Sequence, residues 1–328
     1  MFQYILRRLT LFIPTLIAIS IVAFILIQLP PGDYLTSYVA TLASSGESVD
    51  EAQLAALERR YGLDQPIYVQ YAKWMWGIFH GDFGMSFEWN KPVREIIWDR
   101  LFFTVVVSAS SMLFTWIVGI PIGIYSATHQ YTIGDYLATI VGFVGLGIPN
   151  FMIALVLLWV GFSYFGTEIG GLFSPEFQGV PWSLAKAVNL LEHLWVPIIV
   201  LGTSETAWTI RSTRANMLDE LHKPYVITAR SKGLPERELL WKYPVRVALN
   251  PFFSTVGYAL PGLISGATII SVVLSLPTAG PVLLRALMAQ DMYLAGSFLM
   301  MLSVLTVIGT LISDLLLAWV DPRIRYGG

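Results

Sequence analysis

Residues 211–250 read RSTRANMLDE LHKPYVITAR SKGLPERELL WKYPVRVALN and lie between two long apolar segments. This stretch, called the polar island below, carries eight of the twenty Lys and Arg residues: Arg211, Arg214, Lys223, Arg230, Lys232, Arg237, Lys242 and Arg246. In polytopic membrane proteins, an excess of Lys and Arg in a loop indicates that the loop stays on the cytoplasmic side. The island therefore predicts a membrane protein with one large cytoplasmic loop that a partner can contact.

The composition of the whole chain supports this class. Hydrophobic residues make up 55% of the 328 residues and charged residues only 13%, which is more apolar than a soluble domain of this length. We therefore expect an all-α polytopic membrane protein. A net charge of −2 provides no general basic field, so nucleic acid is not an expected partner. The chain has no Cys and only four scattered His, so neither a catalytic residue set nor a metal site is predicted.

Six segments have about the twenty apolar residues needed to cross the hydrocarbon core as a helix. They are residues 9–29, 102–127, 136–165 (interrupted at 145–149), 193–210, 252–276 and 294–320. Arg7 and Arg8 place the N-terminus inside, so six crossings leave the C-terminus and the polar island in the cytoplasm as well. The first segment is expected to remain as an anchor, because no small-residue cleavage site follows it. The chain then divides into the N-terminus with the first span (1–29), an outside loop (30–101) and a core of five spans (102–328).

The outside loop is predicted to form a cap with short helices. Residues 48–51 match a capping box that opens a helix to about residue 60, and a second helix is expected from Pro66 through Trp74 and Trp76. We expect these two tryptophans, with Trp89 and Trp98, to lie in the interfacial belt, since Trp is enriched there. The alternative for these tryptophans is a ligand cage.

Two absences narrow the functional class. The sequence contains no G-x-x-x-x-G-K-[ST] phosphate loop, so the chain is not expected to bind ATP by that route. Ionisable residues near the spans are few, namely Arg211, Glu205 and Asp314. This scarcity weakens the interpretation as a stand-alone channel or secondary carrier, because ion-coupled carriers use such groups at mid-membrane.

The polar island is predicted to contain two short helices. The first covers 224–232 and ends before Gly233, where a left-handed cap favours glycine, and the second starts at Pro235. On the first helix, Tyr225, Thr228, Ala229 and Lys232 share one face. Such a face can bind in a groove of another protein. The alternative is a solvated loop whose charges only set the topology.

The order of residues in the island resembles a transporter family. The heptapeptide Thr228-Ala229-Arg230-Ser231-Lys232-Gly233-Leu234 is similar to the T-A-R-x-K-G-L of inner-membrane permeases of ATP-binding-cassette importers, in the first-subunit dipeptide, oligopeptide and nickel branch. The wider family has a motif of Glu-Ala-Ala, then Gly, then Ile-x-Leu-Pro. In the first part of that motif, only Ala229 and Gly233 of this chain match. At its far end Tyr243-Pro244-Val245-Arg246 departs from the pattern.

The resemblance covers nearly the whole chain. Further matching stretches are Tyr4-Ile5-Leu6-Arg7-Arg8-Leu9, Leu29-Pro30-Pro31-Gly32-Asp33, Tyr61-Gly62-Leu63-Asp64-Gln65-Pro66, Gly81-Asp82-Phe83-Gly84-Met85-Ser86 and Asp321-Pro322-Arg323-Ile324-Arg325. The fold that it implies is the six-span permease of a type I importer, in a bacterial or archaeal inner membrane.

The resemblance also implies partners and a docking site. A second, similar permease would complete the path, two ATPase domains would hold ATP and Mg²⁺, and a substrate-binding protein would dock outside. This chain itself would be no enzyme and hold no cofactor. The docking residues that it implies are Tyr225, Thr228, Ala229, Arg230, Lys232, Gly233 and Leu234. In this interpretation Arg230 and Lys232 contact the ATPase, while Ala229 and Gly233 allow its close approach.

One departure concerns the substrate. Many peptide permeases of the branch read V-E-x-V-F-S-W-P before the last span, whereas this chain has Ser271 in place of the acid and Leu276 in place of the tryptophan. Peptides are the expected substrate, with short oligosaccharides or nickel chelates as alternatives. Ser271 and Glu205 are the candidate residues of the translocation path. The alternative for Ser271 is helix packing, and for span glycines such as Gly123 and Gly147 the alternatives are hinges or close packing.

Overall fold

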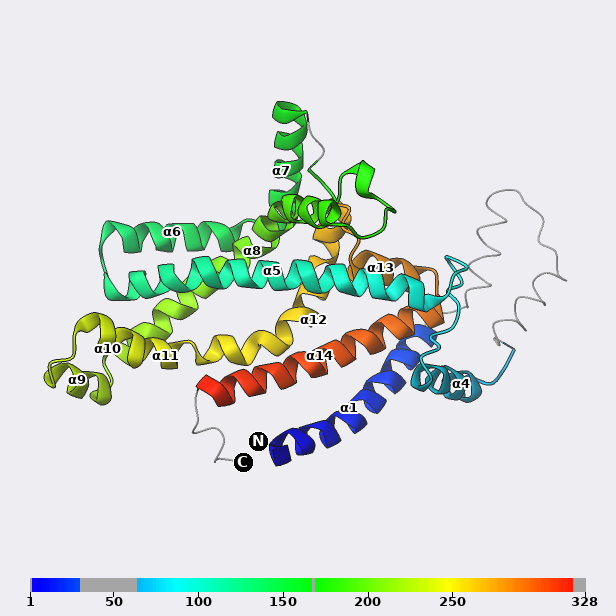
Figure 1. Ribbon diagram of the computed structural model, residues 1–328, viewed down its shortest axis with the longest axis horizontal. Helices are drawn as coiled ribbons and strands as arrows, with labels where there is room; N and C mark the ends of the chain where they lie inside the picture. The colour runs from blue at the N-terminus through cyan, green and yellow to red at the C-terminus, as the bar shows by residue number, and fades with distance from the viewer. Residues whose placement is uncertain (1, 30–63, 167–168, 321–328) are drawn as a thin grey trace. The chain divides into compact units, whose positions relative to one another are not determined.

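The computed structural model describes residues 2–29, 64–166 and 169–320, which are mainly helical (Figure 1). Its helices are α1 (Phe2–Gln28), α4 (Ile67–Phe79), α5 (Val93–Thr128), α6 (Ile133–Gly147), α7 (Asn150–Phe165), the 3₁₀ turn η1 (Pro175–Phe177), α8 (Leu184–Leu221), α9 (Pro224–Ser231), α10 (Glu236–Lys242), α11 (Pro244–Ala248), α12 (Asn250–Val273), α13 (Ala279–Met288) and α14 (Met292–Val320).

Four helices in the described part of the chain are long and apolar enough to cross a membrane: Thr10–Gln28 within α1, Val93–Thr128, Leu184–Leu221 and Met292–Leu317 within α14. A further helix, α12, has 24 residues, about 36 Å at 1.5 Å per residue, and covers most of the predicted span 252–276. The chain is therefore a mainly helical, multi-pass membrane protein.

The predicted third span is broken. Helices α6 and α7 together are apolar enough to cross, but they meet at 93° over the break between Gly147 and Asn150. The cause is local, because Pro149 has no backbone N–H to donate and disfavours helical backbone in the residue before it. The interruption predicted at 145–149 is confirmed, and the predicted third span is divided there into two helices.

Two predicted boundaries are corrected. Helix α8 continues to Leu221, so Arg211 and Arg214 lie on a helix and not in a separate loop. No Pro or Gly occurs between Ile210 and Leu221, and the chain therefore has no reason to leave the helix where it becomes polar. Helix α5 likewise begins at Val93, inside the predicted outside loop.

The chain forms two compact units. Unit 1 comprises Met1–Phe103 and Thr278–Val307, and unit 2 comprises Thr104–Pro277 and Ile308–Gly328. In unit 1, α4 begins after Pro66 as predicted, and its side chains join a core that includes Val93, Ile97, Leu294 and Phe298. The predicted helix over 48–60 and the predicted cytoplasmic tail lie outside the described residues. The division into 1–29, 30–101 and 102–328 is a topological one and stays a prediction.

Trp74 corrects the expectation of an interfacial belt. Its side chain is only 2% exposed, and the benzo edge of its indole lies so close to Gly296 on α14 that a Cβ there would be 2.8 Å from Trp74 Cζ2. Trp76 and Trp98, in contrast, are 70% and 53% exposed. Trp74 is thus a core residue of unit 1, which hydropathy alone does not distinguish from a belt residue.

In unit 2, α5 packs closely along α8 through small residues. A Cβ at Gly119 would lie 2.8 Å from Thr209 Cγ2, and a Cβ at Gly123 would lie 2.6 Å from Thr213 Cβ. These two glycines, four residues apart on α5, therefore serve close packing, the second of the two alternatives. At Gly147 a Cβ would have no neighbour within 4 Å.

Candidate functional site

Helix α9, Gly233 and α10 form the compact element predicted for the polar island, called the docking element below. Pro224 occupies the first turn of α9, where its missing N–H is not needed. Gly233 follows with φ +78° and donates its N–H to the carbonyl of Arg230 at 3.0 Å. Pro235 then caps α10, whose first turn holds Glu236 and Glu238, favourable for the helix dipole. The predicted helix, glycine turn and helix are confirmed.

A small apolar core holds the two helices together. Val226 and Leu239 are fully buried and Ala229 is 6% exposed, with Leu234 and Tyr243 packed against them. Ala229 therefore faces α10, and this corrects its expected role at the surface that a partner approaches. Successive residues of a helix are about 100° apart around its axis. By this spacing Ala229 lies at the edge of the predicted face, on the side of α9 that α10 covers.

An ion pair closes the turn. Arg230 Nε and Nη2 donate to the two carboxylate oxygens of Glu236 at 3.1 and 2.5 Å. The hydrogen bonds from Arg230 lower the pKa of Glu236, and the bonds to Glu236 raise the pKa of Arg230. Both side chains are about half exposed, so the pair orients the turn more than it stabilises the fold.

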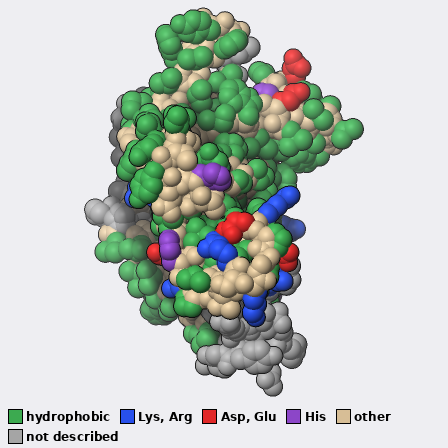
Figure 2. Space-filling view, turned by 90° about the vertical axis from the view of Figure 1, so that its left-hand side faces the viewer, with side chains coloured by type: hydrophobic (Ala, Val, Ile, Leu, Met, Phe, Trp, Pro, Cys, Tyr) green, Lys and Arg blue, Asp and Glu red, His purple; other side chains and the backbone are tan. Residues whose placement is uncertain are grey.

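The outer face of the docking element is exposed and mixed in character. Tyr225 (39% exposed), Ile227 (53% exposed), Thr228 and Lys232 lie on it, and Lys and Arg side chains gather around this end in Figure 2. Trp241 on α10 is 61% exposed and lines a shallow hollow with Pro235, Arg237, Glu238 and Lys242. Sequence reasoning missed Ile227 and Trp241, although a large apolar residue in a polar island is a usable signal.

The docking element is joined to α8. Tyr225 donates a hydrogen bond from its hydroxyl to the carboxylate of Glu220, on the last turn of α8. Burial raises the pKa of Tyr225, and the neighbouring Glu220 carboxylate adds to the shift, so the phenol stays protonated and keeps donating. Helix α9 is thus linked to α8 by this bond and by the short turn at residues 222–223.

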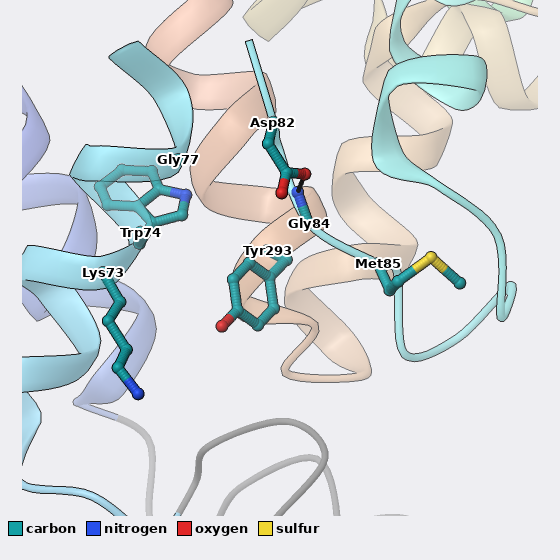
Figure 3. Close-up of a pocket in the computed structure, with 7 residues that line it drawn as sticks. All are labelled: Lys73, Trp74, Gly77, Asp82, Gly84, Met85 and Tyr293. Carbon is teal, nitrogen blue, oxygen red and sulfur yellow. Dashed lines mark hydrogen bonds between the residues drawn. The ribbon is translucent and has the colours of Figure 1, made fainter. Parts of the chain in front are cut away.

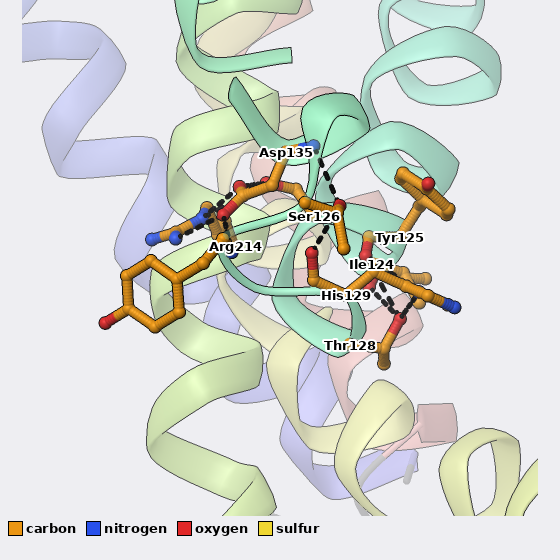
Figure 4. Close-up of polar contacts among 9 residues, drawn as sticks. Ile124, Tyr125, Ser126, Thr128, His129, Asp135 and Arg214 are labelled. Atoms are coloured by element: carbon orange, nitrogen blue, oxygen red, sulfur yellow. Dashed lines mark hydrogen bonds and ion pairs between the residues drawn. The ribbon is translucent and has the colours of Figure 1, made fainter. Parts of the chain in front are cut away.

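At the same end of unit 2, an ion pair with a buried carboxylate ties α8 to the first turn of α6 (Figure 4). Arg214 Nε and Nη2 donate to Asp135 Oδ1 and Oδ2 at 2.9 and 3.0 Å, and the Asp135 side chain is only 4% exposed. Ser126 donates its hydroxyl to the same carboxylate, and the Tyr131 N–H donates at 3.0 Å. We call these contacts the Asp135–Arg214 clasp.

An apolar cluster reinforces the clasp. Ala127 of α5, Met217 of α8, and Val245 and Ala248 of α11 are all at most 2% exposed and pack together. The last turn of α5, the end of α8 and α11 are therefore in mutual contact. No single stretch of the sequence predicts this contact.

The two candidate path residues lie in different surroundings. Glu205 is exposed on α8 within a candidate span, whereas Ser271 on α12 is 4% exposed. The burial of Ser271 favours the helix-packing alternative. Their assignment to a path stays a prediction.

Two family models match the chain. The family described as "Binding-protein-dependent transport system inner membrane component" matches residues 119–326, a range that includes the docking element and the clasp. The family described as "Binding-prot-dependent transport system membrane comp, N-term" matches residues 1–108.

Several relatives align with this chain end to end. The chain is 34% identical over 330 residues to the oligopeptide transport system permease protein AppB of Bacillus subtilis (strain 168), covering 99% of this chain and all of the relative. It is 32% identical to the dipeptide transport system permease protein DppB of Alkalihalophilus pseudofirmus, covering 99% of this chain and 100% of that protein. It is 30% identical to DppB of Escherichia coli (strain K12), covering 99% of each.

Proposed function

Because the chain belongs to the family of inner membrane components of binding-protein-dependent transport systems, we propose that it is a permease subunit of an ATP-driven importer of dipeptides and oligopeptides. The observation that carries the proposal is the family match over residues 119–326, supported by the compact docking element within it. Relatives described as oligopeptide and dipeptide permeases support the substrate class.

The proposal includes specific partners. A second, homologous permease completes the translocation path, two ATPase domains bind ATP and Mg²⁺, and an outside substrate-binding protein delivers the substrate. The polar island faces the cytoplasm, because it holds eight Lys and Arg residues. ATP hydrolysis belongs to the partners, and this chain forms the path.

The contacts at the docking element give the coupling a physical route. A partner that moves α9 pulls on Glu220 through Tyr225, and α8 then moves the start of α6 through the Asp135–Arg214 clasp. Closely packed elements move as rigid bodies and have few stable arrangements. The element thus transmits the closure of an ATPase to helices that line the path.

The first experiment is affinity purification of the tagged full chain in mild detergent, followed by mass spectrometry of the material that remains bound after size exclusion. We expect a homologous permease and a phosphate-loop ATPase in near-equal amounts. A chain that runs alone as a well-folded homo-oligomer, and that transports substrate without ATP, contradicts the proposal and favours a carrier or channel.

A charge reversal tests the docking face. Lys232 is exposed at the end of α9, so Lys232→Glu leaves the α9–α10 core intact, which Ala229→Glu does not. Since a charge-assisted contact is worth roughly 1.4 kcal/mol or more, we expect at least about tenfold weaker ATPase binding and a matching loss of peptide-stimulated ATP hydrolysis. The control is Lys91→Glu, an exposed lysine in unit 1. Equal ATPase binding by the two variants contradicts docking at this face.

A further inference from the structure

Unit 1 contains a hollow that the docking element and the clasp do not involve. It has a volume of about 260 Å³ and lies between α4, the loop before α5 and the first turn of α14 (Figure 3). Its lining residues are Lys73, Trp74, Gly77, Asp82, Gly84, Met85 and Tyr293. Because drug-sized ligands occupy pockets of roughly 300–1,000 Å³, this volume suits a smaller molecule.

Two glycines set the shape of the hollow. Gly84 has φ +79°, and a Cβ there would lie 2.5 Å from Tyr293 Cδ1. A Cβ at Gly77 would lie 2.6 Å from the carbonyl oxygen of Asp82. The loop can therefore rest on α4 and on the Tyr293 ring only with glycine at both positions. Asp82 Oδ1 also accepts a hydrogen bond from the Gly84 N–H at 2.9 Å, which fixes the direction of its carboxylate.

The polar groups around the hollow have unused hydrogen-bonding capacity. The Trp74 indole N–H is buried and has no hydrogen-bond partner among the described residues, and its nitrogen edge faces the side of Asp82 and Tyr293 in Figure 3. A buried donor left without a partner costs roughly 1–3 kcal/mol, so such a group favours a ligand that accepts from it. Lys73 and Asp82 are both exposed, and within the described ranges neither of them takes part in an ion pair.

We infer that this hollow binds the zwitterionic end groups of a small amino-acid-like molecule, such as a dipeptide. Asp82 pairs with the ligand ammonium, Lys73 binds its carboxylate, and the Trp74 N–H, which lies on the Asp82 side, donates to an oxygen of the ligand. Opposite charges on two sides of one small hollow select a molecule that carries both, since a ligand with one charge leaves the other protein charge unpaired. The inference rests on the proposed function, because it names a receiving site for the proposed peptide cargo on the permease itself.

The test measures the binding of dialanine to the purified full chain in lipid nanodiscs, by isothermal titration or by competition with radiolabelled dialanine. Lys73→Met keeps the aliphatic stem of the lysine, and Asp82→Asn keeps the oxygen that accepts from Gly84. Each is expected to weaken dialanine binding at least tenfold. The matched controls are Lys91→Met and Asp99→Asn, which are exposed in the same unit and do not line the hollow. They are expected to bind as the unchanged chain does.

Two modified ligands identify the contacts. N-acetyl-dialanine lacks the ammonium and is expected to bind the unchanged chain at least tenfold more weakly than dialanine does, but to bind Asp82→Asn about as well as dialanine binds that variant. Dialanine amide lacks the carboxylate, and the same is expected of it with Lys73→Met. This non-additivity is the signature of a direct pair. In the crossed combinations, N-acetyl-dialanine with Lys73→Met and dialanine amide with Asp82→Asn, a further tenfold loss is expected, whereas a variant that has merely lost its fold binds every ligand equally poorly.

The outcomes separate this inference from the proposed function. Saturable dialanine binding with both non-additive pairs supports the site. The absence of saturable binding up to about 10 mM, or equal affinity in the hollow and control variants, overturns it. Peptide uptake by the reconstituted complex is measured in parallel, and its absence overturns the proposed function without altering the binding result.

Discussion

At the scale of single residues, the Asp135 carboxylate depends on the donors around it. Its carboxylate is 4% exposed and accepts hydrogen bonds from Arg214, Ser126 and the Tyr131 N–H. A carboxylate with this little water is tolerated only when such donors compensate its charge. Arg214 is different, because 29% of its side chain is exposed and water can solvate it.

This asymmetry predicts unequal costs for the two partners. Arg214→Met leaves a buried carboxylate without its cation and is expected to lower the free energy of unfolding by about 3 kcal/mol. Asp135→Asn leaves a guanidinium that can turn to water and is expected to cost about 1–2 kcal/mol. The measurement is denaturant unfolding of the full chain in detergent, with Arg237→Met on α10 as a control. If Asp135→Asn lowers the free energy of unfolding as much as Arg214→Met does, the contribution of the clasp to stability is not the compensation of a buried charge.

At the scale of elements, the contact between α5 and α8 is made by glycine and threonine. Gly119 and Gly123 face Thr209 and Thr213, and the backbone carbonyl of Ile210 would lie 2.8 Å from a Cβ at Gly123. Backbones that approach this closely gain van der Waals contact, which is the main attraction between helices in lipid. The same contact holds α8, and with it the docking element, against α5.

A pair of glycine substitutions separates packing from helix propensity. Gly123→Ala forces its methyl group into Thr213 and the Ile210 carbonyl, and is expected to destabilise the chain by about 1–3 kcal/mol. Gly147→Ala meets no atom within 4 Å and is expected to be neutral or slightly stabilising, since alanine favours helix. Thermal unfolding of both variants in the same detergent checks this. Equal losses would show that the α5–α8 contact is not tight.

At the scale of the whole molecule, a charged side chain inside a span indicates where water or another chain lies. Glu205 is exposed within the candidate span of α8. A carboxylate that faces lipid at mid-membrane costs roughly 2.5–3.5 kcal/mol or more. Glu205 is therefore expected to face a water-filled path or the second permease, and Ser271, which is buried, is expected to serve packing.

Two substitutions distinguish these roles in the assembled importer. Glu205→Gln is expected to leave the thermal stability of the chain unchanged and to slow dipeptide uptake about tenfold, the effect of losing roughly 1.4 kcal/mol of interaction with a cationic group. Ser271→Ala is expected to cost about 1 kcal/mol of stability and to leave uptake per folded complex unchanged. The measurements are uptake into proteoliposomes and thermal unfolding. Unchanged uptake by Glu205→Gln would remove Glu205 from the path.

Much of this protein follows from properties that each segment has by itself. Apolar length identifies the candidate spans in α1, α5, α8 and α14, the charge of residues 211–250 identifies the island, and Pro224, Gly233 and Pro235 delimit its two short helices. These features depend on local backbone preference and on the transfer of side chains to lipid, which are properties of a continuous stretch of residues. They also carry the family resemblance that the comparisons confirm.

Contacts between distant segments were decided only by the tertiary structure. Asp135 and Arg214 are 79 residues apart, Ala229 is buried because α10 folds back over it, and Trp74 lies in the core because Gly296 leaves room for it. Such outcomes depend on which surfaces meet, and no single stretch of sequence contains both surfaces.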